Sequence, residues 1–218
     1  MPIVSIHTPK AAGTTLLTLF RQAYGEDAVL VDVADSPANP TSPMHLDPEG
    51  WLERRPSRLP PRIKVVHGHF HPVKFDKLDN AFRLTFLRHP VDNLVSIYFY
   101  WKQIPPQPNA LHQYFLSANL DILGLARLPL YRNLYTSTYF GGWDMGRLDF
   151  IGRYETREKD LARLESVLGV PLDATLHVNA TEPERINLER EAMLDDRRLI
   201  GRLTDILAED ISFYEKYV

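Results

Sequence analysis

Cysteine is absent from this 218-residue chain, and so are long apolar runs. Without cysteine, the chain cannot form disulfides, zinc ribbons, iron–sulfur clusters or a thiol nucleophile. No stretch approaches the roughly 20 consecutive apolar residues of a membrane helix. The N-terminus, MPIVSIHTPK, also lacks the basic segment and longer apolar segment of a secretory signal peptide. These absences predict a soluble, cytoplasmic protein.

An excess of positive charge is missing as well. Lys and Arg number 25 against 28 Asp and Glu, which gives a formal net charge of −3. No overall positive field therefore draws the chain to nucleic acid or to anionic lipid, and we expect neither as a partner. The apolar fraction of 44% and the charged fraction of 24% are ordinary for a globular protein. At roughly 150 residues per domain, we expect residues 1–218 to form one domain.

Short apolar runs alternate with segments of helical spacing. Residues 35–62 are different, because seven of the 17 prolines fall there and predict a long loop with one short helix near 49–55. The alternation predicts an α/β fold, with three α/β/α layers around a central parallel sheet, and ligands bind such sheets at the carboxyl ends of the strands. Strands are expected at residues 2–6, 28–33, 64–66, 81–87 and 150–154, and the main helices at 14–24, 90–102, 158–168 and from about 188 onwards.

The segment that joins the first strand to the first helix, HTPKAAGTT, predicts an anion-binding loop. Gly13 permits close approach of the backbone to a ligand, and the helix N-terminus supplies unpaired N–H groups. Thr14 and Thr15 add hydroxyl groups, and Lys10 adds a full positive charge. The loop is not the GxxxxGK[ST] loop of nucleotide triphosphatases, because Lys10 precedes Gly13 and no glycine precedes the lysine.

PKAAGTT resembles the 5′-phosphosulfate loop of the sulfotransferases that use 3′-phosphoadenosine 5′-phosphosulfate (PAPS). It is most similar to the PKTAGTT of their carbohydrate branch. A second motif of this family is an arginine at a strand end, with proline two residues on and serine eight residues on. The chain has Arg88, Pro90 and Ser96 in this arrangement. Weaker similarities extend the resemblance over most of the chain, at residues 133–142, 150–155 and 177–179.

The resemblance implies a P-loop-like nucleotide-binding core that uses PAPS as its donor co-substrate and needs no metal. In the family, the first loop binds the 5′-phosphosulfate, and the strand-end arginine and the serine bind the 3′-phosphate. Lys10 is also expected to be catalytic, by neutralising charge on the departing phosphate. The residues expected to bind the donor are Lys10, Ala12, Gly13, Thr14, Thr15, Arg88 and Ser96.

Three histidines alternate in HGHFH, directly after the third expected strand. In one hypothesis a histidine is the general base, because its pKa lies near neutrality. Sulfotransferases of the 2-O type carry a similar His-Gly-His and use a histidine as the base, so His69 is the first candidate and His67 the second. A second hypothesis places all three imidazoles on one strand face as a zinc site. A third gives them a structural role, which we expect for His71 and also for His89.

The sequence as a whole predicts a sulfotransferase that acts on a hydroxyl group of a carbohydrate, a lipid or a small molecule. We expect the acceptor to contact residues 35–62 and the aromatic-rich segment 103–147. The mild negative charge favours a small or weakly charged acceptor over a heparin-like chain, although the basic run from Arg54 to Lys64 leaves an anionic acceptor open. The alternatives are a nucleotide-dependent kinase of similar fold and a non-catalytic nucleotide-binding protein.

Overall fold

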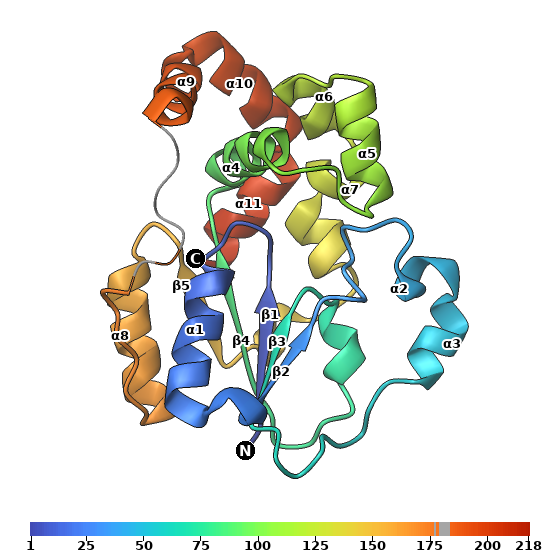
Figure 1. Ribbon diagram of the computed structural model, residues 1–218, viewed down its shortest axis with the longest axis vertical. Coiled ribbons are helices and arrows are strands. Elements are labelled where there is room, and N and C mark those ends of the chain that lie inside the picture. Colours follow the sequence, from blue (N-terminus) through green and yellow to red (C-terminus); the bar gives the residue numbers. More distant parts are fainter. Residues whose placement is uncertain (177, 179–183) are drawn as a thin grey trace.

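The computed structural model describes residues 1–176, 178 and 184–218. Five strands of the described residues form one sheet in the order β2-β3-β1-β4-β5, and every pairing is parallel (Figure 1). The expected strands are all present, and the predicted α/β architecture is confirmed. The strands are β1 (Ile3–His7), β2 (Val29–Asp32), β3 (Val65–Gly68), β4 (Phe82–Leu87) and β5 (Phe150–Arg153).

Helices connect the strands and follow the last of them. Pro90 is the first residue of the helix at residues 90–103, a position at which the backbone N–H has no partner within the helix, so proline is tolerated there. Gly169 ends the helix at residues 157–168 in the left-handed conformation, with φ 66°. A π-helix at Leu134–Tyr139 was not foreseen in the sequence. The α-helices are α1 (Gly13–Tyr24), α2 (Pro43–Leu46), α3 (Pro48–Glu53), α4 (Pro90–Gln103), α5 (Ala110–Ser117), α6 (Ile122–Arg127), α7 (Pro129–Arg132), α8 (Arg157–Leu168), α9 (Glu184–Asp195), α10 (Arg197–Ile206) and α11 (Ala208–Tyr217), and short 3₁₀ turns lie at Glu26–Ala28, Pro72–Phe75 and Met145–Arg147.

Each face of the sheet is covered by its own hydrophobic core. Ile3 of β1 packs in the core that includes Leu16 and Leu19 of α1 and residues of α8. Val4 and Ile6 of the same strand belong to the second core, which contains residues of α4, α6, α10 and α11. Successive side chains of a strand point to opposite faces, so the apolar run of β1 supplies both layers, as expected for a buried parallel strand (Figure 1).

The HTPKAAGTT loop, the HGHFH segment and Arg88 stand at the ends of the strands β1, β3 and β4. Because β1 lies between β3 and β4 and the strands are parallel, these three motifs lie side by side at the carboxyl ends of the strands. Two buried threonine hydroxyls form hydrogen bonds between the carboxyl ends of β1 and β4. Thr8 Oγ1 donates to the carbonyl of Phe86 at 3.0 Å, and Thr85 Oγ1 donates to the carbonyl of Ile6 at 2.9 Å. The loop after His7 and the arginine after Leu87 are therefore held side by side.

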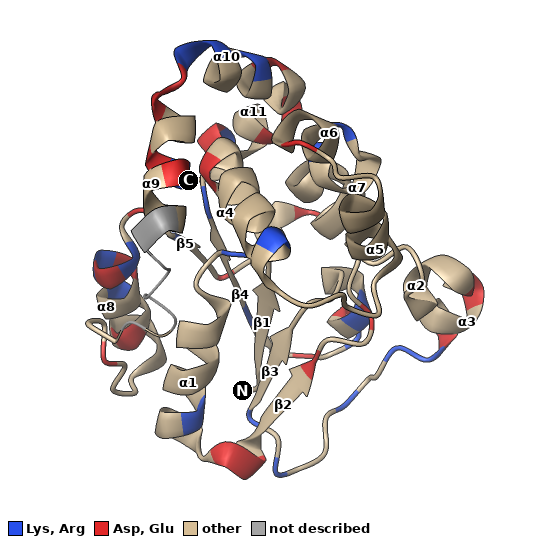
Figure 2. Ribbon diagram, turned by 45° about the horizontal axis from the view of Figure 1, so that its top comes forward, with Lys and Arg blue, Asp and Glu red and all other residues tan. Residues whose placement is uncertain are grey.

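Charged residues of both signs are interspersed over the outer helices and loops (Figure 2). None of the helices within the described part of the chain has both the length and the apolar character of a membrane span.

Candidate functional site

The loop between β1 and α1 has a strained backbone at two of its residues. Lys10 and Ala12 both adopt positive φ, at 58° and 62°, whereas Ala11 between them does not. Such left-handed residues other than glycine cost about 1–3 kcal/mol each and concentrate at ligand sites. Alternating right- and left-handed residues create a concave nest of backbone N–H groups that binds anions. Ala12 also precedes the first residue of α1, so the helix N-terminus faces the same space.

Gly13 is required in this loop by the side chain of His7. A Cβ added at Gly13 would lie 1.9 Å from Nε2 of His7, so only glycine allows the imidazole to pack beneath the loop. The amide of Asn93, on α4, supports the loop from the other side by donating to the carbonyl of Pro9 at 2.8 Å. No role was assigned to His7 or Asn93 from the sequence, although His7 is the first residue of the HTPKAAGTT segment.

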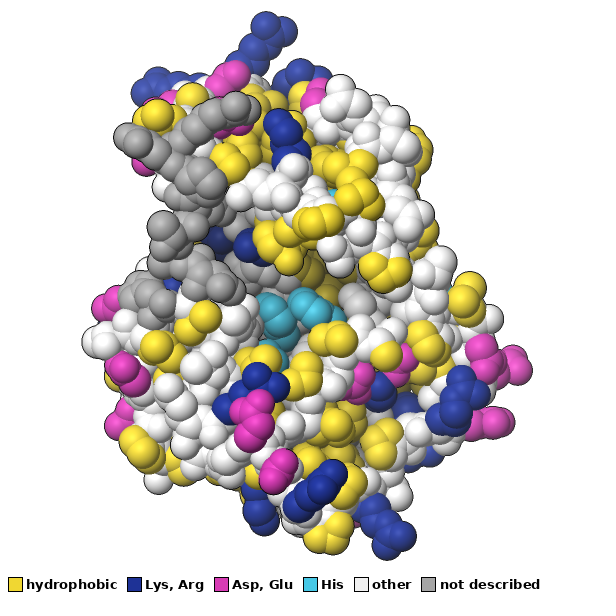
Figure 3. Space-filling model, viewed as in Figure 1, with side chains coloured by type: hydrophobic (Ala, Val, Ile, Leu, Met, Phe, Trp, Pro, Cys, Tyr) yellow, Lys and Arg dark blue, Asp and Glu magenta, His cyan; other side chains and the backbone are white. Residues whose placement is uncertain are grey.

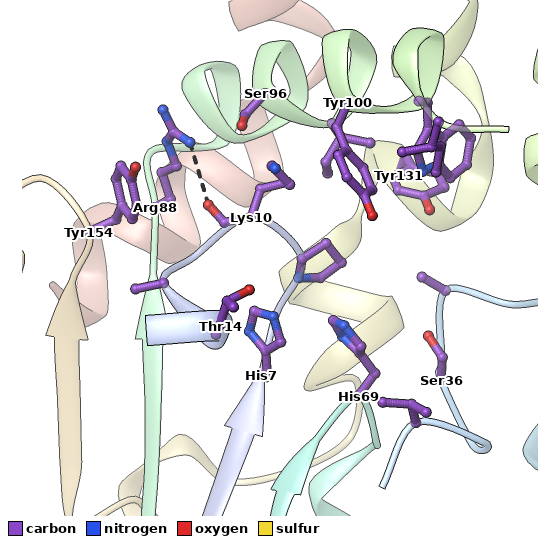
Figure 4. Close-up of a pocket in the computed structure, with 18 of the residues that line it drawn as sticks. His7, Lys10, Thr14, Ser36, His69, Arg88, Ser96, Tyr100, Tyr131 and Tyr154 are labelled. Atoms are coloured by element: carbon purple, nitrogen blue, oxygen red, sulfur yellow. Dashed lines mark hydrogen bonds between the residues drawn. The ribbon is translucent and has the colours of Figure 1, made fainter. Parts of the chain in front are cut away.

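Arg88 and Ser96 line the same cavity as the loop (Figure 4). Arg88 follows β4 directly, and Ser96 lies on α4 nearly two turns after Pro90; both are buried. The Arg88 guanidinium lies 4.2 Å from the centroid of the Tyr154 ring and reaches the carbonyl of Lys10 at 3.4 Å. Its Nε is buried and makes no hydrogen bond, and no carboxylate among the described residues forms an ion pair with it.

The cavity has a volume of about 850 Å³ and contains four cationic residues among those that line it. These are Lys10, Arg88, Arg157 and Arg190. Burial lowers the pKa of Arg88, and the charge of Arg190 lowers it further. Cations placed this close repel one another, so the arrangement is suited to a ligand with several negative charges.

Three imidazoles stack below the loop. The ring of His7 lies 4.4 Å from that of His69 and 5.4 Å from that of His67, between centroids. His69 and His7 line the cavity, whereas His67 is not among the described residues that do so; it is buried, with Nδ1 2.9 Å from Ser5 Oγ. Histidine side chains are visible at the floor of a hollow in Figure 3.

The three histidines of HGHFH have separate partners. Nδ1 of His69 lies 3.0 Å from the hydroxyl of Tyr139, and Nε2 of His71 lies 3.1 Å from the carbonyl of Gly141. Nδ1 of His71 accepts from the Val73 N–H, which gives this residue the structural role expected for it. Within the described residues, no three His, Cys, Asp or Glu side chains are grouped so as to hold a metal ion.

No protein-family model matches the chain, and no curated protein matches it. Among solved structures, it is similar to a sulfotransferase from Alicyclobacillus acidocaldarius, with 16% identity and a TM-score of 0.42 over 99% of both chains. It is also similar to mouse sulfotransferase SULT7A1 complexed with PAP, with 15% identity and a TM-score of 0.43. That likeness covers 88% of this chain and 62% of the mouse chain.

A second group of lining residues is uncharged, and its labelled members Ser36, Tyr100 and Tyr131 lie on the side of the cavity away from Arg88 and Tyr154 (Figure 4). They come from the loop after β2, from the second half of α4 and from the segment up to α7. Both segments expected to contact an acceptor thus contribute, whereas the basic run from Arg54 to Lys64 does not line the cavity. The lining residues at this end are Val33, Ser36, Ala38, Ile97, Tyr100, Trp101, Ile104, Gln107, Asn109, His112 and Tyr131.

The residues expected to bind the donor are brought together. Lys10, Ala12, Gly13, Thr14, Thr15, Arg88 and Ser96 all line the one cavity. Tyr154, from the similarity at residues 150–155, lines the cavity too, and so do Arg157, Asn187 and Arg190, to which the sequence assigned no role. In the similarity at residues 177–179, Val178 lines the cavity, and His177 and Asn179 lie outside the described residues.

The buried carboxylate of Asp210, on the last helix, is linked to the backbone of Arg88 through the π-helix. Asp210 accepts from the backbone N–H groups of Tyr135 and Thr136 at 2.8 and 2.9 Å, and so holds the π-helix. The hydroxyl of Tyr135 in turn donates to the carbonyl of Arg88 at 2.8 Å and accepts from its N–H at 3.2 Å. The C-terminal helix therefore contributes to the position of the cationic site.

The buried histidines predict a loss of stability in mild acid. Burial lowers the pKa of His67 to about 3 and of His69 to about 4, and it lowers those of His7 and His71 as well. The unfolded chain, with histidine pKa values near 6.5, therefore binds more protons than the folded chain between about pH 6.5 and 4. We expect the free energy of unfolding to fall as the pH drops through this window, because protons bind the unfolded chain first.

Urea denaturation between pH 7.5 and 4.5 measures this slope. His67→Gln removes one of the titrating groups and is expected to make the slope shallower. A free energy of unfolding that stays constant across the window would contradict burial of neutral imidazoles.

Proposed function

We propose that the chain is a sulfotransferase that moves a sulfuryl group from PAPS to a hydroxyl group of an acceptor, with residues 1–218 forming one domain. The observation that carries this proposal is the shared cavity, in which the anion-binding loop and the Arg88–Ser96 pair face one ligand space. Lys10, Arg88, Arg157 and Arg190 line this cavity together, and four cationic side chains around one space are suited to a donor that is charged at both ends.

The donor fits the groups that line this end of the cavity. The N–H groups around Gly13 to Thr15, together with Lys10, would hold the 5′-phosphosulfate, and Arg88 with Ser96 would hold the 3′-phosphate. The orphan Nε of Arg88 supports this assignment, because a buried donor without a partner costs about 1–3 kcal/mol unless a ligand completes it. When bound, PAPS supplies an activated sulfuryl group whose bond to the 5′-phosphate breaks as the acceptor oxygen takes it. His69 is the proposed base for the acceptor proton, with His67 as the second candidate.

The acceptor is proposed to be small and weakly charged. The residues that would receive it, among them Tyr100, Trp101 and Tyr131, are uncharged, and the cation beside them is Lys10, whose Nζ lies 4.3 Å from the centroid of the Tyr100 ring. Aromatic rings bind the apolar faces of sugars and of hydroxylated ring compounds, whereas an anionic acceptor needs a cation. This supports a small carbohydrate or another small hydroxyl compound over a polyanionic chain.

Calorimetric titration with 3′-phosphoadenosine 5′-phosphate (PAP) tests the donor site. We expect binding to PAP and no competition from ATP with magnesium, and the reverse preference would favour a nucleotide-dependent kinase. Transfer from labelled PAPS across a panel of hydroxyl compounds then tests the reaction. PAP binding without transfer to any acceptor or to water would favour a non-catalytic nucleotide-binding protein.

Lys10 is expected to act on the reacting end of the donor. Replacing it with alanine should lower turnover by about 10²- to 10³-fold while weakening PAP binding much less, because its charge acts where negative charge develops. Lys102→Ala is a matched control. Nζ of Lys10 lies 4.3 Å from the centroid of the Tyr100 ring, and Nζ of Lys102 lies 5.3 Å from that of Tyr98. Lys102, however, is exposed and is not among the residues that line the cavity. A loss of PAP affinity that accounts for the whole loss of rate would give Lys10 a role in binding alone.

A further inference from the structure

One face of α4 lines the cavity from its cationic residues to its uncharged ones. Ser96 and Tyr100 are four residues apart, so their side chains lie on the same face of the helix, and both line the cavity. Ile104, directly after the helix, lines it as well. The Tyr100 ring points from α4 into the cavity (Figure 4). Tyr100 therefore lies between Ser96, which is proposed to bind the donor, and the uncharged residues that are proposed to bind the acceptor.

Tyr100 differs from its aromatic neighbours in its exposure. Trp101 and Tyr131 also line the cavity, but they are only 7% and 5% exposed, whereas Tyr100 is 43% exposed. The ring centroid of Trp101 lies 5.0 Å from that of Tyr131 and 5.4 Å from that of Phe115, and both contacts are edge-to-face. Of the three aromatic side chains at this part of the cavity, Tyr100 is therefore the most accessible to a ligand.

The ammonium group of Lys10 lies over the Tyr100 ring. Its Nζ is 4.3 Å from the ring centroid, well within the roughly 6 Å at which a ring face attracts a cation. The backbone of Lys10 is held in place, because its carbonyl accepts a hydrogen bond from Arg88 at 3.4 Å. The four-carbon stem of lysine is flexible, so the ammonium group can swing from the ring towards a bound phosphate while the backbone stays fixed.

The ring and the donor compete for this ammonium group. A cation over an exposed ring is a weak contact, and its loss changes an affinity by only about two- to fivefold. A charge-assisted hydrogen bond from the ammonium group to a phosphate oxygen is stronger. Lys10 is therefore expected to leave Tyr100 when the donor binds, and its departure uncovers one face of the ring.

We propose that Tyr100 holds Lys10 before the donor binds, releases it to the donor, and then binds a ring of the acceptor on the uncovered face. This exchange rests on the proposed sulfotransferase function. It sets an order of binding, donor before acceptor, because Lys10 and the acceptor compete for the same face of Tyr100. It also defines the class of acceptor as a neutral hydroxyl compound with a ring that stacks on tyrosine. Tyr100 takes no proton and determines specificity only.

The position of Lys10 can be followed by NMR, because protons over an aromatic ring resonate upfield. In protein with ¹³C-labelled lysine, we expect upfield ε-CH₂ protons for Lys10 that return to the ordinary position when PAP is added. Tyr100→Leu should place them there without PAP. Tyr114→Leu, which removes a ring that is 51% exposed and is not among the described residues lining the cavity, should change nothing. An upfield shift that survives saturation with PAP would overturn the exchange.

Calorimetric titration measures the competition itself. Tyr100→Leu should bind PAP about two- to fivefold more tightly than the unsubstituted protein, because no contact between Lys10 and the ring has to be broken. Tyr100→Phe keeps the ring and should bind PAP with unchanged affinity, as should Tyr114→Leu. Unchanged or weaker PAP binding by Tyr100→Leu would overturn the exchange.

Phenol, a neutral ring with one hydroxyl group, serves as the probe of the acceptor side. Its Kd should be about two- to fivefold lower with PAP bound than without, and by linkage phenol should tighten PAP binding by the same factor. The factor should fall to one in Lys10→Ala, in which the ring face is uncovered throughout. Phenol binding that does not respond to PAP in the unsubstituted protein would contradict the uncovering of the ring.

These measurements distinguish failure of the exchange from failure of the proposed function. Loss of PAP binding in the unsubstituted protein would count against the sulfotransferase assignment itself, and the exchange would fall with it. Normal PAP binding with Lys10 still over Tyr100 would overturn the exchange and leave the assignment intact.

Discussion

His69→Ala is expected to lower sulfuryl transfer by about 10²- to 10⁴-fold, the range found when a positioned general base is removed. His69 is the histidine of the HGHFH segment that lines the cavity, and its Nδ1 lies 3.0 Å from the hydroxyl of Tyr139. The PAP dissociation constant should change little, because the proposed donor contacts lie on the loop and on Arg88. Transfer rates and calorimetric titration on the same preparation measure the two quantities.

His67→Ala is the matched comparison. We expect His69→Ala to lower the transfer rate and His67→Ala to lower the stability of the fold. His67 is 3% exposed and its imidazole is paired with the buried hydroxyl of Ser5. Its removal leaves that hydroxyl without a partner and creates a cavity, which together predict a loss of about 2–5 kcal/mol in unfolding free energy. The transfer rate of the protein that remains folded should be retained. A large rate loss in His67→Ala with none in His69→Ala would exchange their roles.

Those parts of the site that depend on neighbours in sequence could be predicted. The loop from Pro9 to Thr15 is a local unit, because a strand end, a glycine and a helix start are enough to create an anion site. The same holds for Arg88 and Ser96, whose separation follows from the rise of one helix. The order of the strands then brings the two motifs together, and an alternating pattern of strands and helices predicts that as well.

Contacts between distant segments could not be predicted in this way. The hydrogen bond between His69 and Tyr139 joins residues 70 positions apart along the chain. Sequence patterns placed Tyr139 only within the aromatic-rich segment 103–147, with no link to the histidines. Its position depends on the π-helix, and the π-helix depends on Asp210 of the last helix. No sequence pattern indicates that the Asp210 carboxylate bonds to a backbone N–H 75 residues away.

His7 illustrates a different failure. It is the first residue of the recognised HTPKAAGTT segment, but histidine at a strand end is as compatible with exposure as with burial. Its position beneath the loop follows from Gly13, whose missing Cβ leaves room for the ring, so the glycine and the histidine form one packing unit. The sequence predicted that Gly13 lets a ligand approach the backbone. In the structure Gly13 also leaves space for the side chain of His7.

Arg88→Met is expected to weaken PAP binding by about 30- to several-thousand-fold, which corresponds to the 2–5 kcal/mol typical of a buried charge that loses its partner. The effect on the free protein should be small or opposite in sign. Arg88 is 7% exposed, its Nε makes no hydrogen bond, and Arg190 opposes its charge. Methionine keeps much of the volume against Tyr154 while removing the buried charge, so the free energy of unfolding without PAP should stay level or rise.

Arg83 is the matched control at the opposite end of β4. Its guanidinium donates to the backbone carbonyls of Ala81 and Leu78 at 3.1 and 2.9 Å, far from the cavity lining. Arg83→Met should therefore lower stability, because it leaves those carbonyls without a donor, and should leave PAP affinity unchanged. Urea denaturation with and without PAP measures both effects in one series. A destabilised Arg88→Met that still binds PAP normally would show that the arginine supports the fold, and would remove the main argument for a 3′-phosphate at this end of the cavity.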